Sequence, residues 1–313
     1  MSKKIIAFGE LLWDVLPDST VLGGAPFNFA YRVNTLGDQG LMVSRLGRDA
    51  LGREAYDKVA ALELDTQYLQ WDEQKPTGTV QVSFDANNSP DYVIIPDVAY
   101  DFIECHDHLL QSVLDADCLC FGTLVQRNNT ARETLAQLLE HSPNSLKMLD
   151  INLRRKCYSP ETIAFSLRHA DILKLNETEA HQLGDMLEIN DVTIPGFCQR
   201  IIEKCSLQYC LVTLEERGAF AASLEGEKVY IPGFQIDLAD SLGAGDAFSA
   251  GFIYKILRGE SLQTACIYGN ILGAIVATQI GATVPIVPGD IESFATQNTN
   301  RNIDNKFKAL TAV

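Results

Sequence analysis

The sequence predicts one α/β domain with a mainly parallel sheet and a small β element outside that sheet. Hydrophobic residues make up 46% of the 313 residues and charged residues 21%, a globular balance that can bury a large core. From about residue 115, short apolar runs alternate with helical stretches, which implies right-handed crossovers between parallel strands. Around residues 77–96, two β-rich runs follow each other with no helix between them.

In the first part of the chain, apolar runs and helical spacing predict two strand–helix pairs. The predicted strands are 5–8 and 41–44, and the predicted helices are 25–36 and 50–62. Residues 77–85 and 91–96 are predicted strands of a hairpin, because the turn signal at 86–90 joins them. We expect this hairpin to stand apart from the main sheet.

The second part of the chain is more regular. The predicted strands are 118–121, 146–151, 172–175 and 209–213, and the predicted helices include 129–141, 193–204, 245–257 and 262–279. Residues 297–305 are polar and rich in Asn, so we predict a frayed tail there rather than an element. Since no internal repeat or low-complexity block divides the chain, residues 1–313 are predicted to form one domain that ends in a polar tail, 297–313.

The net charge and the cysteines narrow the functional classes. A chain with a net charge of −16 is a poor candidate for binding nucleic acid or an anionic membrane, and it has no apolar run long enough to span a bilayer. Its eight scattered cysteines form no C-x-x-C pair, which indicates reduced thiols. The apolar run after the first residues is too short for a signal peptide. We therefore expect a cytoplasmic protein with small-molecule ligands.

A Gly-rich turn, DSLGAGD at residues 240–246, opens one of the long predicted helices. Small residues there leave consecutive N–H groups free to hold an anion. Asp246 falls in the first helical turn, where the helix dipole favours an ionised carboxylate. An acid beside a phosphate is useful when a neutral alcohol lies between them, because the acid can then take the hydroxyl proton. The plainer interpretation is an Asp that only caps the helix.

A second Gly-rich segment, GGAPFNFA at residues 23–30, opens an earlier helix. Pro26 suits the first turn, and the two glycines let the backbone approach a ligand closely. The amide of Asn28 is both donor and acceptor, which suits a sugar hydroxyl, and Asp14 could accept two vicinal hydroxyls. The plainer interpretation is a tight turn with a solvated Asn.

Together these segments resemble the two signatures of the ribokinase-like carbohydrate kinases, also called the phosphofructokinase B family. The first signature matches across 23–47 and the second across 240–253, and two patterns in the correct order are more specific than one Gly-rich turn. The resemblance covers roughly residues 4–290. It implies a three-layer α/β/α core with a small β lid from about 11–17 and 77–96, and a kinase that uses ATP and Mg²⁺.

The resemblance also implies roles for residues on the acceptor side. Asp246 corresponds to the catalytic base, and an anion hole corresponds to Gly243, Ala244 and Gly245. The residues that fall where the family binds sugar are Asp14, Gly24 and Asn28. The segment DINLR at 150–154 is similar to a family motif, D-x-N-x-R. Its Arg154 is expected to reach sugar or phosphate, and a surface ion pair is the competing interpretation.

On the nucleotide side, Asn176 and Glu179 match the family motif N-x-x-E, which helps to organise Mg²⁺ and phosphate through water. A helix cap with a dipole-matched Glu is the plainer interpretation of the same pair. Thr213 and Gly218 lie in a segment that normally reads T-x-G-x-x-G and lines the nucleotide. Here Glu215 stands in place of the first glycine, which leaves the nucleotide contacts and preference open.

Gly281 falls where the family places the edge of its purine pocket. In many members an acid at the position of Asp240, with backbone near 281, binds a monovalent cation beside the anion hole. K⁺ is therefore an expected candidate ligand of this chain. We also expect a homodimer, because an exposed lid sheet has unpaired edges that can pair with another chain.

The acceptor is predicted to be D-fructose, since the motifs are most similar to the fructokinase branch and lack the lysine typical of ribokinases. Arg154 keeps open an acidic sugar such as 2-keto-3-deoxygluconate, because Arg pairs well with carboxylates. A nucleoside kinase of the same fold and a catalytically silent sugar sensor are two further hypotheses. The chain has no P-loop and no G-x-G-x-x-G after its first strand. The cluster CHDH at 105–108 has no second ligand set to make a metal site.

Overall fold

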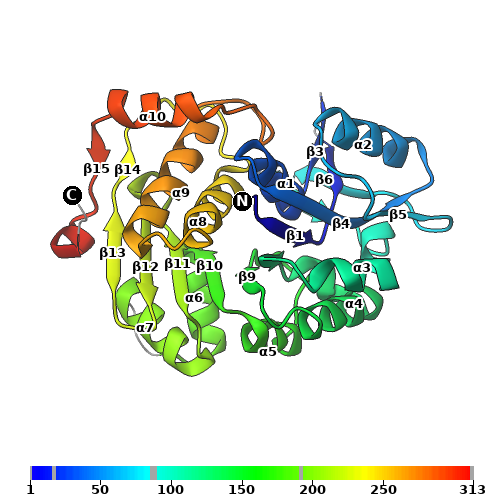
Figure 1. Cartoon of the computed structure of the whole chain (residues 1–313), viewed down its shortest axis with the longest axis horizontal. Coiled ribbons are helices and arrows are strands. Elements are labelled where there is room, and N and C mark those ends of the chain that lie inside the picture. Colours follow the sequence, from blue (N-terminus) through cyan, green and yellow to red (C-terminus); the bar gives the residue numbers. More distant parts are fainter. Residues whose placement is uncertain (1, 16–18, 85–89, 190–192, 311–313) are drawn as a thin grey trace.

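The main sheet has nine strands in the order β13-β12-β11-β10-β9-β8-β1-β4-β5 in the computed structural model, which describes residues 2–15, 19–84, 90–189 and 193–310 (Figure 1). The strands are β1 Lys4–Phe8, β4 Gln39–Gly47, β5 Leu69–Asp72, β8 Cys118–Phe121, β9 Leu146–Asp150, β10 Ile172–Asn176, β11 Tyr209–Thr213, β12 Ala219–Ser223 and β13 Lys228–Ile231. The strands from β11 to β5 are parallel, and β12 and β13 form an antiparallel edge. The mainly parallel sheet is therefore confirmed.

Helices cover both faces of this sheet (Figure 1). On one face lie α1 Ala25–Thr35, α2 Ala50–Ala61, α8 Ala244–Ile256 and α9 Leu262–Ala277, with α10 Pro288–Gln297 against α9. On the other lie α3 Asp107–Val113, α4 Asn129–Glu140, α5 Pro160–His169, α6 Glu177–Met186 and α7 Ile194–Cys205. Alternate side chains of β1 enter the two cores, Ile6 and Phe8 on one side and Ile5 and Ala7 on the other. This is the three-layer α/β/α architecture that we expected.

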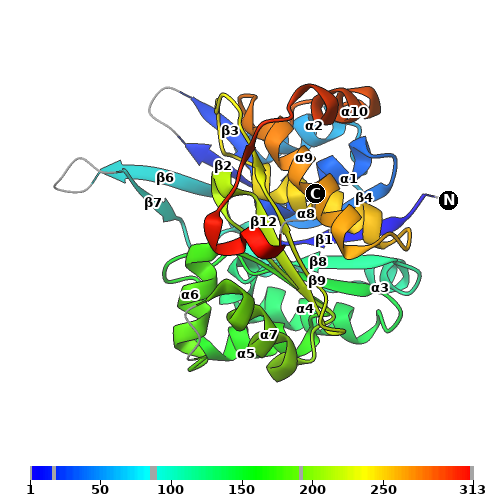
Figure 2. The same ribbon diagram turned by 90° about the vertical axis from the view of Figure 1, so that its left-hand side faces the viewer.

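A second sheet of four strands, in the order β3-β2-β6-β7, projects from the core (Figure 2). Its strands are β2 Leu12–Val15, β3 Thr20–Gly23, β6 Gly78–Phe84 and β7 Pro90–Ile94. The predicted hairpin is confirmed outside the main sheet, and β2 lies in the segment predicted to join it. The sequence did not predict β3. The predicted lid residues 16 and 17 and most of the predicted hairpin turn, 86–89, lie outside the described residues.

The predicted strands and helices of the main domain are all present, most of them within one or two residues of the expected bounds. The strands β5, β12 and β13 were not predicted. Short 3₁₀ helices also occur, η1 Ala99–Phe102, η2 Leu124–Arg127, η3 Glu215–Arg217 and η4 Asn305–Leu310. Of these, η2 follows β8, and its Leu124 lines the candidate site.

The prediction of a frayed tail over 297–305 is wrong. Residues 301 and 302 form β15 Arg301–Asn302, which pairs with β14 Gly233–Phe234. The 3₁₀ helix η4 then places Phe307, which is 3% exposed, against the rings of Tyr230 and Phe220. The sequence is polar around Phe307, and one buried aromatic side chain is enough to dock the segment on the edge of the core. Residues 311–313 lie outside the described part.

All eight cysteines are free thiols, and six of them are buried. The prediction of unpaired core thiols is confirmed for those six, whereas Cys105 and Cys205 are only partly buried. Among the described residues, no helix combines the length and hydropathy needed to cross a membrane.

The sheet order places a topological switch point beside β1. From β1 the chain continues to β4 on one side, and β8 pairs with β1 on the other side. In open parallel sheets, ligands bind at the carboxyl ends of the strands at such a point. The segments that follow β1, β8 and β9 are therefore the place where a site is expected.

Candidate active site

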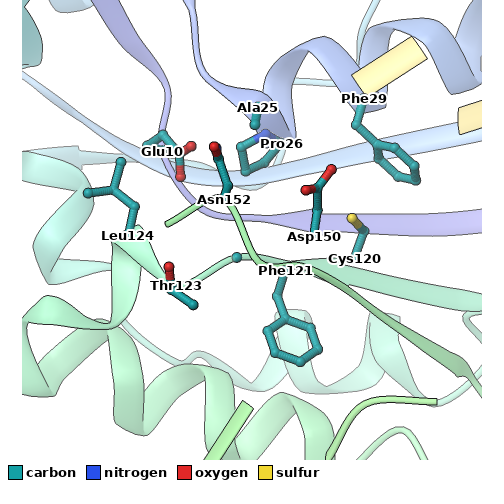
Figure 3. A pocket seen from close by; sticks show the side chains of 11 residues that line it. Glu10, Ala25, Pro26, Phe29, Cys120, Phe121, Thr123, Leu124, Asp150 and Asn152 are labelled. Atoms are coloured by element: carbon teal, nitrogen blue, oxygen red, sulfur yellow. The ribbon is translucent and has the colours of Figure 1, made fainter. Parts of the chain in front are cut away.

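A pocket opens at this switch point, between the carboxyl ends of β1, β8 and β9 and the start of α1 (Figure 3). It is lined by Glu10, Ala25, Pro26, Phe29, Cys120, Phe121, Gly122, Thr123, Leu124, Asp150 and Asn152. Asp246 does not line this pocket. Asp150 does line it, and the charge of Asp150 raises the pKa of Asp246. The pocket is therefore part of a larger polar site that continues toward the start of α8.

The Gly-rich turn forms the start of α8 as predicted. Gly243 is the N-cap residue and has φ 76°, a left-handed conformation that favours glycine. A Cβ on Gly243 would lie 2.3 Å from the Cβ of Ala282, so the loop that contains Ala282 also requires a glycine here. Ala244 and Gly245 follow as the first helical residues. The turn lies at a helix N-terminus, where anions bind readily, but the Ala244 amide, which was predicted to be free, donates to the carbonyl oxygen of Ser241 at 3.3 Å.

Asp246 lies in the first turn of α8, as predicted, and is half-buried. Its Oδ2 accepts a hydrogen bond of 2.8 Å from Nδ2 of Asn28. Burial, and then the charge of Asp150, raise the pKa of Asp246 to about 6, while Lys174, the Asn28 hydrogen bond and Arg154 lower it. We expected the helix dipole to favour an ionised carboxylate. Burial shifts the pKa in the opposite direction, and at neutral pH the carboxylate is still mainly ionised.

A buried ion pair lies beneath this turn that the sequence analysis did not identify. Nζ of Lys174 lies 3.1 Å from Oδ1 and 3.0 Å from Oδ2 of Asp150. Ser249 Oγ donates to Oδ2 of the same carboxylate at 3.1 Å. A Cβ on Gly245 would lie 3.0 Å from the Lys174 ammonium. The Lys174 charge is therefore held directly against the anion-holding turn.

Of the residues predicted to bind sugar, Asn28 contacts Asp246, and Asp14 and Gly24 lie around the Gly-rich segment that precedes α1. Asp14 is on β2, and a Cβ on Gly23 would lie 2.7 Å from its Oδ2. Gly24 has φ 118°, and a Cβ there would lie 2.4 Å from the carbonyl oxygen of Glu10, so only glycine fits. Asn28 is 4% exposed, and its Oδ1 has no hydrogen-bond partner among the described residues. This side of the site therefore offers a buried acceptor to a ligand.

Arg154 follows β9 and is exposed. It forms no hydrogen bond or ion pair with another described residue, so the competing prediction of a surface ion pair does not hold within that part of the chain. Its charge nevertheless lowers the pKa of Glu10, Asp14 and Asp246. Arg154 is therefore, with Lys174, a cation whose charge acts on the carboxylates around the pocket.

Glu10 is a second residue that the sequence analysis did not place in the site. It is 4% exposed and is one of the residues that line the pocket (Figure 3). Burial raises the pKa of Glu10 to about 7, while the N–H groups of Glu10 and Ala25 and the charge of Arg154 lower it. Its position after the first strand was the available signal, because polar residues at strand ends are site candidates.

Asn176 and Glu179 form the predicted helix cap at the start of α6. Oδ1 of Asn176 accepts from the Glu179 amide at 2.8 Å, and Oε2 of Glu179 accepts from the Asn176 amide at 2.9 Å. Oε1 of Glu179 also accepts from the Leu153 amide at 2.8 Å. Each carboxylate oxygen keeps a further lone pair. The capping interpretation thus holds, and it leaves Glu179 able to accept from water.

The segment predicted to line the nucleotide follows β11. Glu215 has φ 56°, so it takes the left-handed conformation for which the family uses glycine. Gly218 has φ 96°, and a Cβ there would lie 2.0 Å from the carbonyl oxygen of Ile231. The half-buried Thr213 ends β11 beside this turn. The replacement of glycine by Glu215 therefore keeps the backbone shape and adds an exposed charge.

Asp240 and Gly281 lie together as predicted. Oδ2 of Asp240 accepts from the Gly281 amide at 3.1 Å, and Oδ1 accepts from the Leu242 amide at 3.0 Å. This carboxylate joins the loop after α9 to the turn before α8. A cation there would meet a carboxylate that already accepts two hydrogen bonds.

Among the described residues, no group of three or more His, Cys, Asp or Glu side chains could hold a metal ion. A Mg²⁺ ion that arrives on nucleotide phosphates keeps several waters and needs few protein ligands. Glu179, with its free lone pairs, fits such an ion through water.

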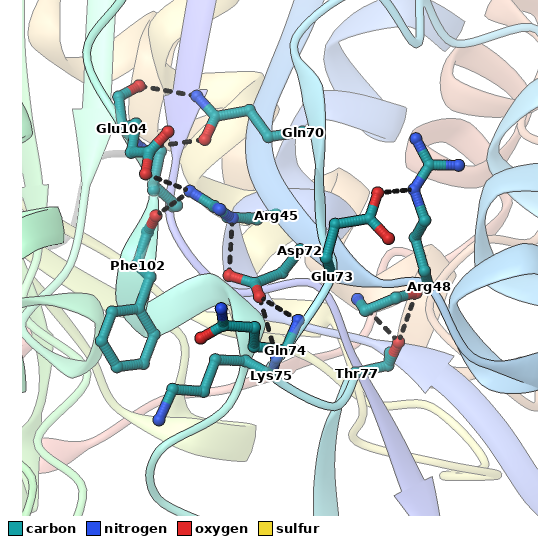
Figure 4. A network of polar contacts seen from close by, with 12 residues as sticks. Arg45, Arg48, Gln70, Asp72, Glu73, Gln74, Lys75, Thr77, Phe102 and Glu104 are labelled. Carbon is teal, nitrogen blue, oxygen red and sulfur yellow. Dashed lines mark hydrogen bonds and ion pairs between the residues drawn. The ribbon is translucent and has the colours of Figure 1, made fainter.

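A polar network fixes the chain where it passes from β5 into the small sheet (Figure 4). Oδ1 of Asp72 accepts from the amides of Gln74 and Lys75, both at 2.8 Å. Arg45 forms an ion pair of 2.9 Å with Oδ2 of Asp72. Thr77 Oγ1 lies 3.0 Å from the Gly47 amide that donates to it. The small sheet is thus anchored to the core at the base of β6.

Fold and site together define a carbohydrate kinase. The model of the pfkB family carbohydrate kinases matches residues 3–288, so the chain belongs to this family. The Arabidopsis thaliana protein named Probable fructokinase-3 is 26% identical over 334 residues, which cover 97% of this chain and 94% of that protein. The 2-dehydro-3-deoxygalactonokinase of Haloferax volcanii is 25% identical over 313 residues, which cover 93% and 96%.

Among solved structures, a fructokinase with bound ATP from Xylella fastidiosa superposes with a TM-score of 0.82 and 21% identity. The alignment covers 95% of this chain and 99% of that one. This likeness shows the ribokinase-like fold, and the sequence relatives support the fructokinase branch.

Proposed function

We propose that this protein transfers the γ-phosphate of ATP to a hydroxyl of a small sugar, most favourably D-fructose, with Asp246 as general base. The observation that carries the proposal is the position of Asp246. Its carboxylate lies in the first turn of α8, directly after the amides of the Gly243 turn, and is held by Asn28. Base and anion-holding amides on one turn are what in-line phosphoryl transfer needs.

In this mechanism Asp246 accepts the proton of the acceptor hydroxyl as that oxygen attacks the γ-phosphorus. A pKa of about 6 suits this role, because a base works best when its pKa lies near the working pH. The amides of Gly243, Ala244 and Gly245 stabilise the charge that spreads over the transferring phosphoryl oxygens. Lys174 adds a fixed positive charge beneath them.

Mg²⁺, when bound on the phosphates, neutralises their charge and orients them. Asn176 and Glu179 would hold it through water, as their position at the start of α6 favours. Thr213, Gly218 and Gly281 would line the nucleotide, and Asp240 with Gly281 offers a place for K⁺. The small sheet would act as a lid over the sugar, which excludes water from the transferring group.

On the acceptor side, Asp14, Gly24, Asn28 and Arg154 would bind the sugar. The unpartnered Oδ1 of Asn28 would accept from a sugar hydroxyl, which removes the cost of leaving a buried acceptor unpaired. D-Fructose fits a site that offers mainly acceptors to hydroxyl groups. The fructokinase relatives support the same acceptor.

A second acceptor class, acidic sugars such as 2-keto-3-deoxygluconate, is favoured by one observation. Arg154 faces the site without an ion pair to a described residue, and Arg binds carboxylates well. A relative named for an acidic deoxy sugar, the Haloferax volcanii kinase, agrees with this second class. A nucleoside kinase and a silent sugar sensor are further hypotheses, which a panel of acceptors distinguishes from the first two.

The test is an ADP-release assay with Mg²⁺-ATP against fructose, ribose, 2-keto-3-deoxygluconate, glucose and adenosine, with and without K⁺. Turnover restricted to fructose is the expected result. Strong turnover on 2-keto-3-deoxygluconate would show that the acceptor is an acidic sugar and would leave the proposed mechanism unchanged. No ADP release with any of the five would contradict the proposed function and favour the sensor. Cytoplasmic location and a homodimer stay predictions from the sequence.

A further inference from the structure

Arg32 is the most deeply buried arginine among the described residues, and the mechanism above does not use it. It lies on α1 and is 1% exposed. Its Nη2 donates to the carbonyl oxygens of Ala282 at 3.2 Å and Val284 at 3.0 Å. Its Nε and Nη1 have no hydrogen-bond partner among the described residues. A buried guanidinium with unpaired N–H groups lowers the stability of the fold. We therefore looked for a role that could explain its burial.

The carbonyl groups that Arg32 binds belong to the loop that backs the anion-holding turn. Ala282 follows Gly281, whose amide donates to Asp240. The Ala282 side chain also packs where a Cβ on Gly243 would lie, at 2.3 Å from that position. Any shift of this loop therefore changes the packing against Gly243.

Arg32 lies one helical turn after Asn28, so the two side chains leave the same face of α1. Asn28 holds Asp246 through the 2.8 Å hydrogen bond. Arg32 holds the loop that packs against Gly243. The two ends of the 243–246 turn are thus fastened to one helix, and that helix begins with the Gly-rich segment of the acceptor side.

We infer that Arg32 is a positioning residue that fixes the 282–284 backbone against Gly243, and so aligns the anion-holding turn with the helix that binds the acceptor. The catalytic meaning of this alignment rests on the proposed function. Burial lowers the pKa of Arg32 to about 10, so the guanidinium stays charged at neutral pH. Both carbonyl oxygens are bound by the one Nη2 group of the guanidinium.

A second arginine that ties α1 to another part of the chain provides a matched control. Arg258 follows α8, and its Nη1 and Nη2 lie 2.9 and 2.8 Å from the carboxylate of Asp38, which follows α1. This pair fastens the far ends of α1 and α8, away from the 243–246 turn. Replacing it removes a helix–helix tie without touching the loop at 282–284.

The experiment compares Arg32→Lys and Arg32→Met with Arg258→Gln. We expect the KM for ATP to rise and kcat to fall, together about tenfold or more for Arg32→Met, because small misplacements at a reacting centre are costly. Arg32→Lys should give a smaller loss, and the KM for the acceptor should stay within about twofold. Arg258→Gln should lower only the melting temperature. Unchanged nucleotide kinetics in the Arg32 variants, with the same thermal effect as Arg258→Gln, would overturn the inference.

Ala282→Gly tests the same contact if the Arg32 variants do not fold. It removes the methyl group that packs on Gly243 and keeps Arg32, and we expect it to weaken ATP in the same direction. No change in ATP kinetics for Ala282→Gly would count against the inference.

Calorimetric binding of a non-hydrolysable ATP analogue separates this inference from the proposed function. If the protein releases no ADP with any sugar, the proposed function fails, and weaker analogue binding by Arg32→Lys still supports the positioning role. Analogue affinity equal to that of the wild type would reject the role. An analogue that does not bind the wild-type protein would overturn both.

Discussion

Nζ of Lys174 lies 3.0 Å from Oδ2 of Asp150, and both residues are buried. A buried lysine is stable as a cation only with such a partner. Burial lowers the pKa of Lys174, but the charges of Asp150, Asp246 and Glu179 raise it above its usual value. The ammonium is therefore a fixed positive charge under the turn that precedes Asp246, and it offsets part of the protein's overall negative charge at this site.

The first prediction concerns Asp246 itself. Asp246→Asn keeps the size of the side chain and removes its ability to accept a proton, so kcat should fall by about 10²–10⁴. The KM for ATP should change much less, since the amides of the turn remain. The measurement is steady-state kinetics on the best acceptor of the panel. A kcat close to that of the wild type would remove Asp246 from the role of base.

The pH dependence of activity follows from the raised pKa of the same group. A base must be deprotonated to act, so kcat/KM for the acceptor should be constant at neutral pH and fall as the pH drops through about 6. An acid limb near pH 4, the range of an unperturbed carboxyl, would show that burial does not shift the working base.

Asp150→Asn should shift the acid limb of the kcat/KM profile to lower pH. The negative charge of Asp150 raises the pKa of Asp246, and Lys174 lowers it, so neutralising Asp150 leaves the lysine charge dominant. Ser249→Ala is the matched control, because it removes a hydrogen bond to Asp150 and no charge. A limb that stays in place in Asp150→Asn, or that moves equally in Ser249→Ala, would contradict this electrostatic coupling.

The fold could be predicted from the sequence wherever the hydrophobic periodicity and the residues that end helices and strands indicate the same element. The run 118–121 and the helix that ends before Gly37 are examples, because each is specified by its own residues. The strand Ala219–Ser223 was missed for a physical reason. Its sequence, AFAAS, contains helix-favouring alanines, and it is a strand because all five residues are buried between β11 and β13. Tertiary pairing overrides local preference there.

Some residues of the candidate site could likewise be predicted from local sequence, and others could not. Gly24 and Gly243 were predictable, because a Gly-rich turn before a helix is a local signal in the sequence. The pair of Lys174 and Asp150 depends on two strands that meet only in the folded sheet. A signal did exist, since a lysine inside the apolar strand Ile172–Asn176 needs a buried partner. Its identity could not be read locally.

The C-terminal segment gives a prediction about stability. Phe307→Ala removes a ring that is 3% exposed and packs against Tyr230 with ring centroids 5.0 Å apart. The free energy of unfolding should fall by about 3–5 kcal/mol, measured by urea denaturation. The neighbouring Lys308→Ala, at an exposed position, should stay within about 0.5 kcal/mol of the wild type. Equal stability of the two variants would mean that the segment does not contribute to the core.

Glu215 carries the last prediction, because its backbone and its charge can be tested separately. A non-glycine residue at φ 56° costs about 1–2 kcal/mol, and glycine relieves that cost while adding about 0.4–1 kcal/mol of unfolded-state entropy. Glu215→Gly should therefore be more stable by up to about 1.6 kcal/mol. Under the proposed function, it should also lower the KM for ATP by about twofold to threefold, since an exposed negative charge near phosphates contributes little more than that.

Glu215→Gln separates the two effects. It keeps the left-handed backbone strain and removes the charge, so it should lower the KM for ATP without raising the melting temperature. Glu216→Gln is the control, because Glu216 is the next residue, is also exposed and is not among the residues with positive φ. If Glu216→Gln lowers the KM as much as Glu215→Gln, the effect is one of general surface charge. If Glu215→Gly is no more stable than Glu215→Gln, the turn tolerates the left-handed glutamate without strain, and the family's glycine serves only to leave room for the nucleotide.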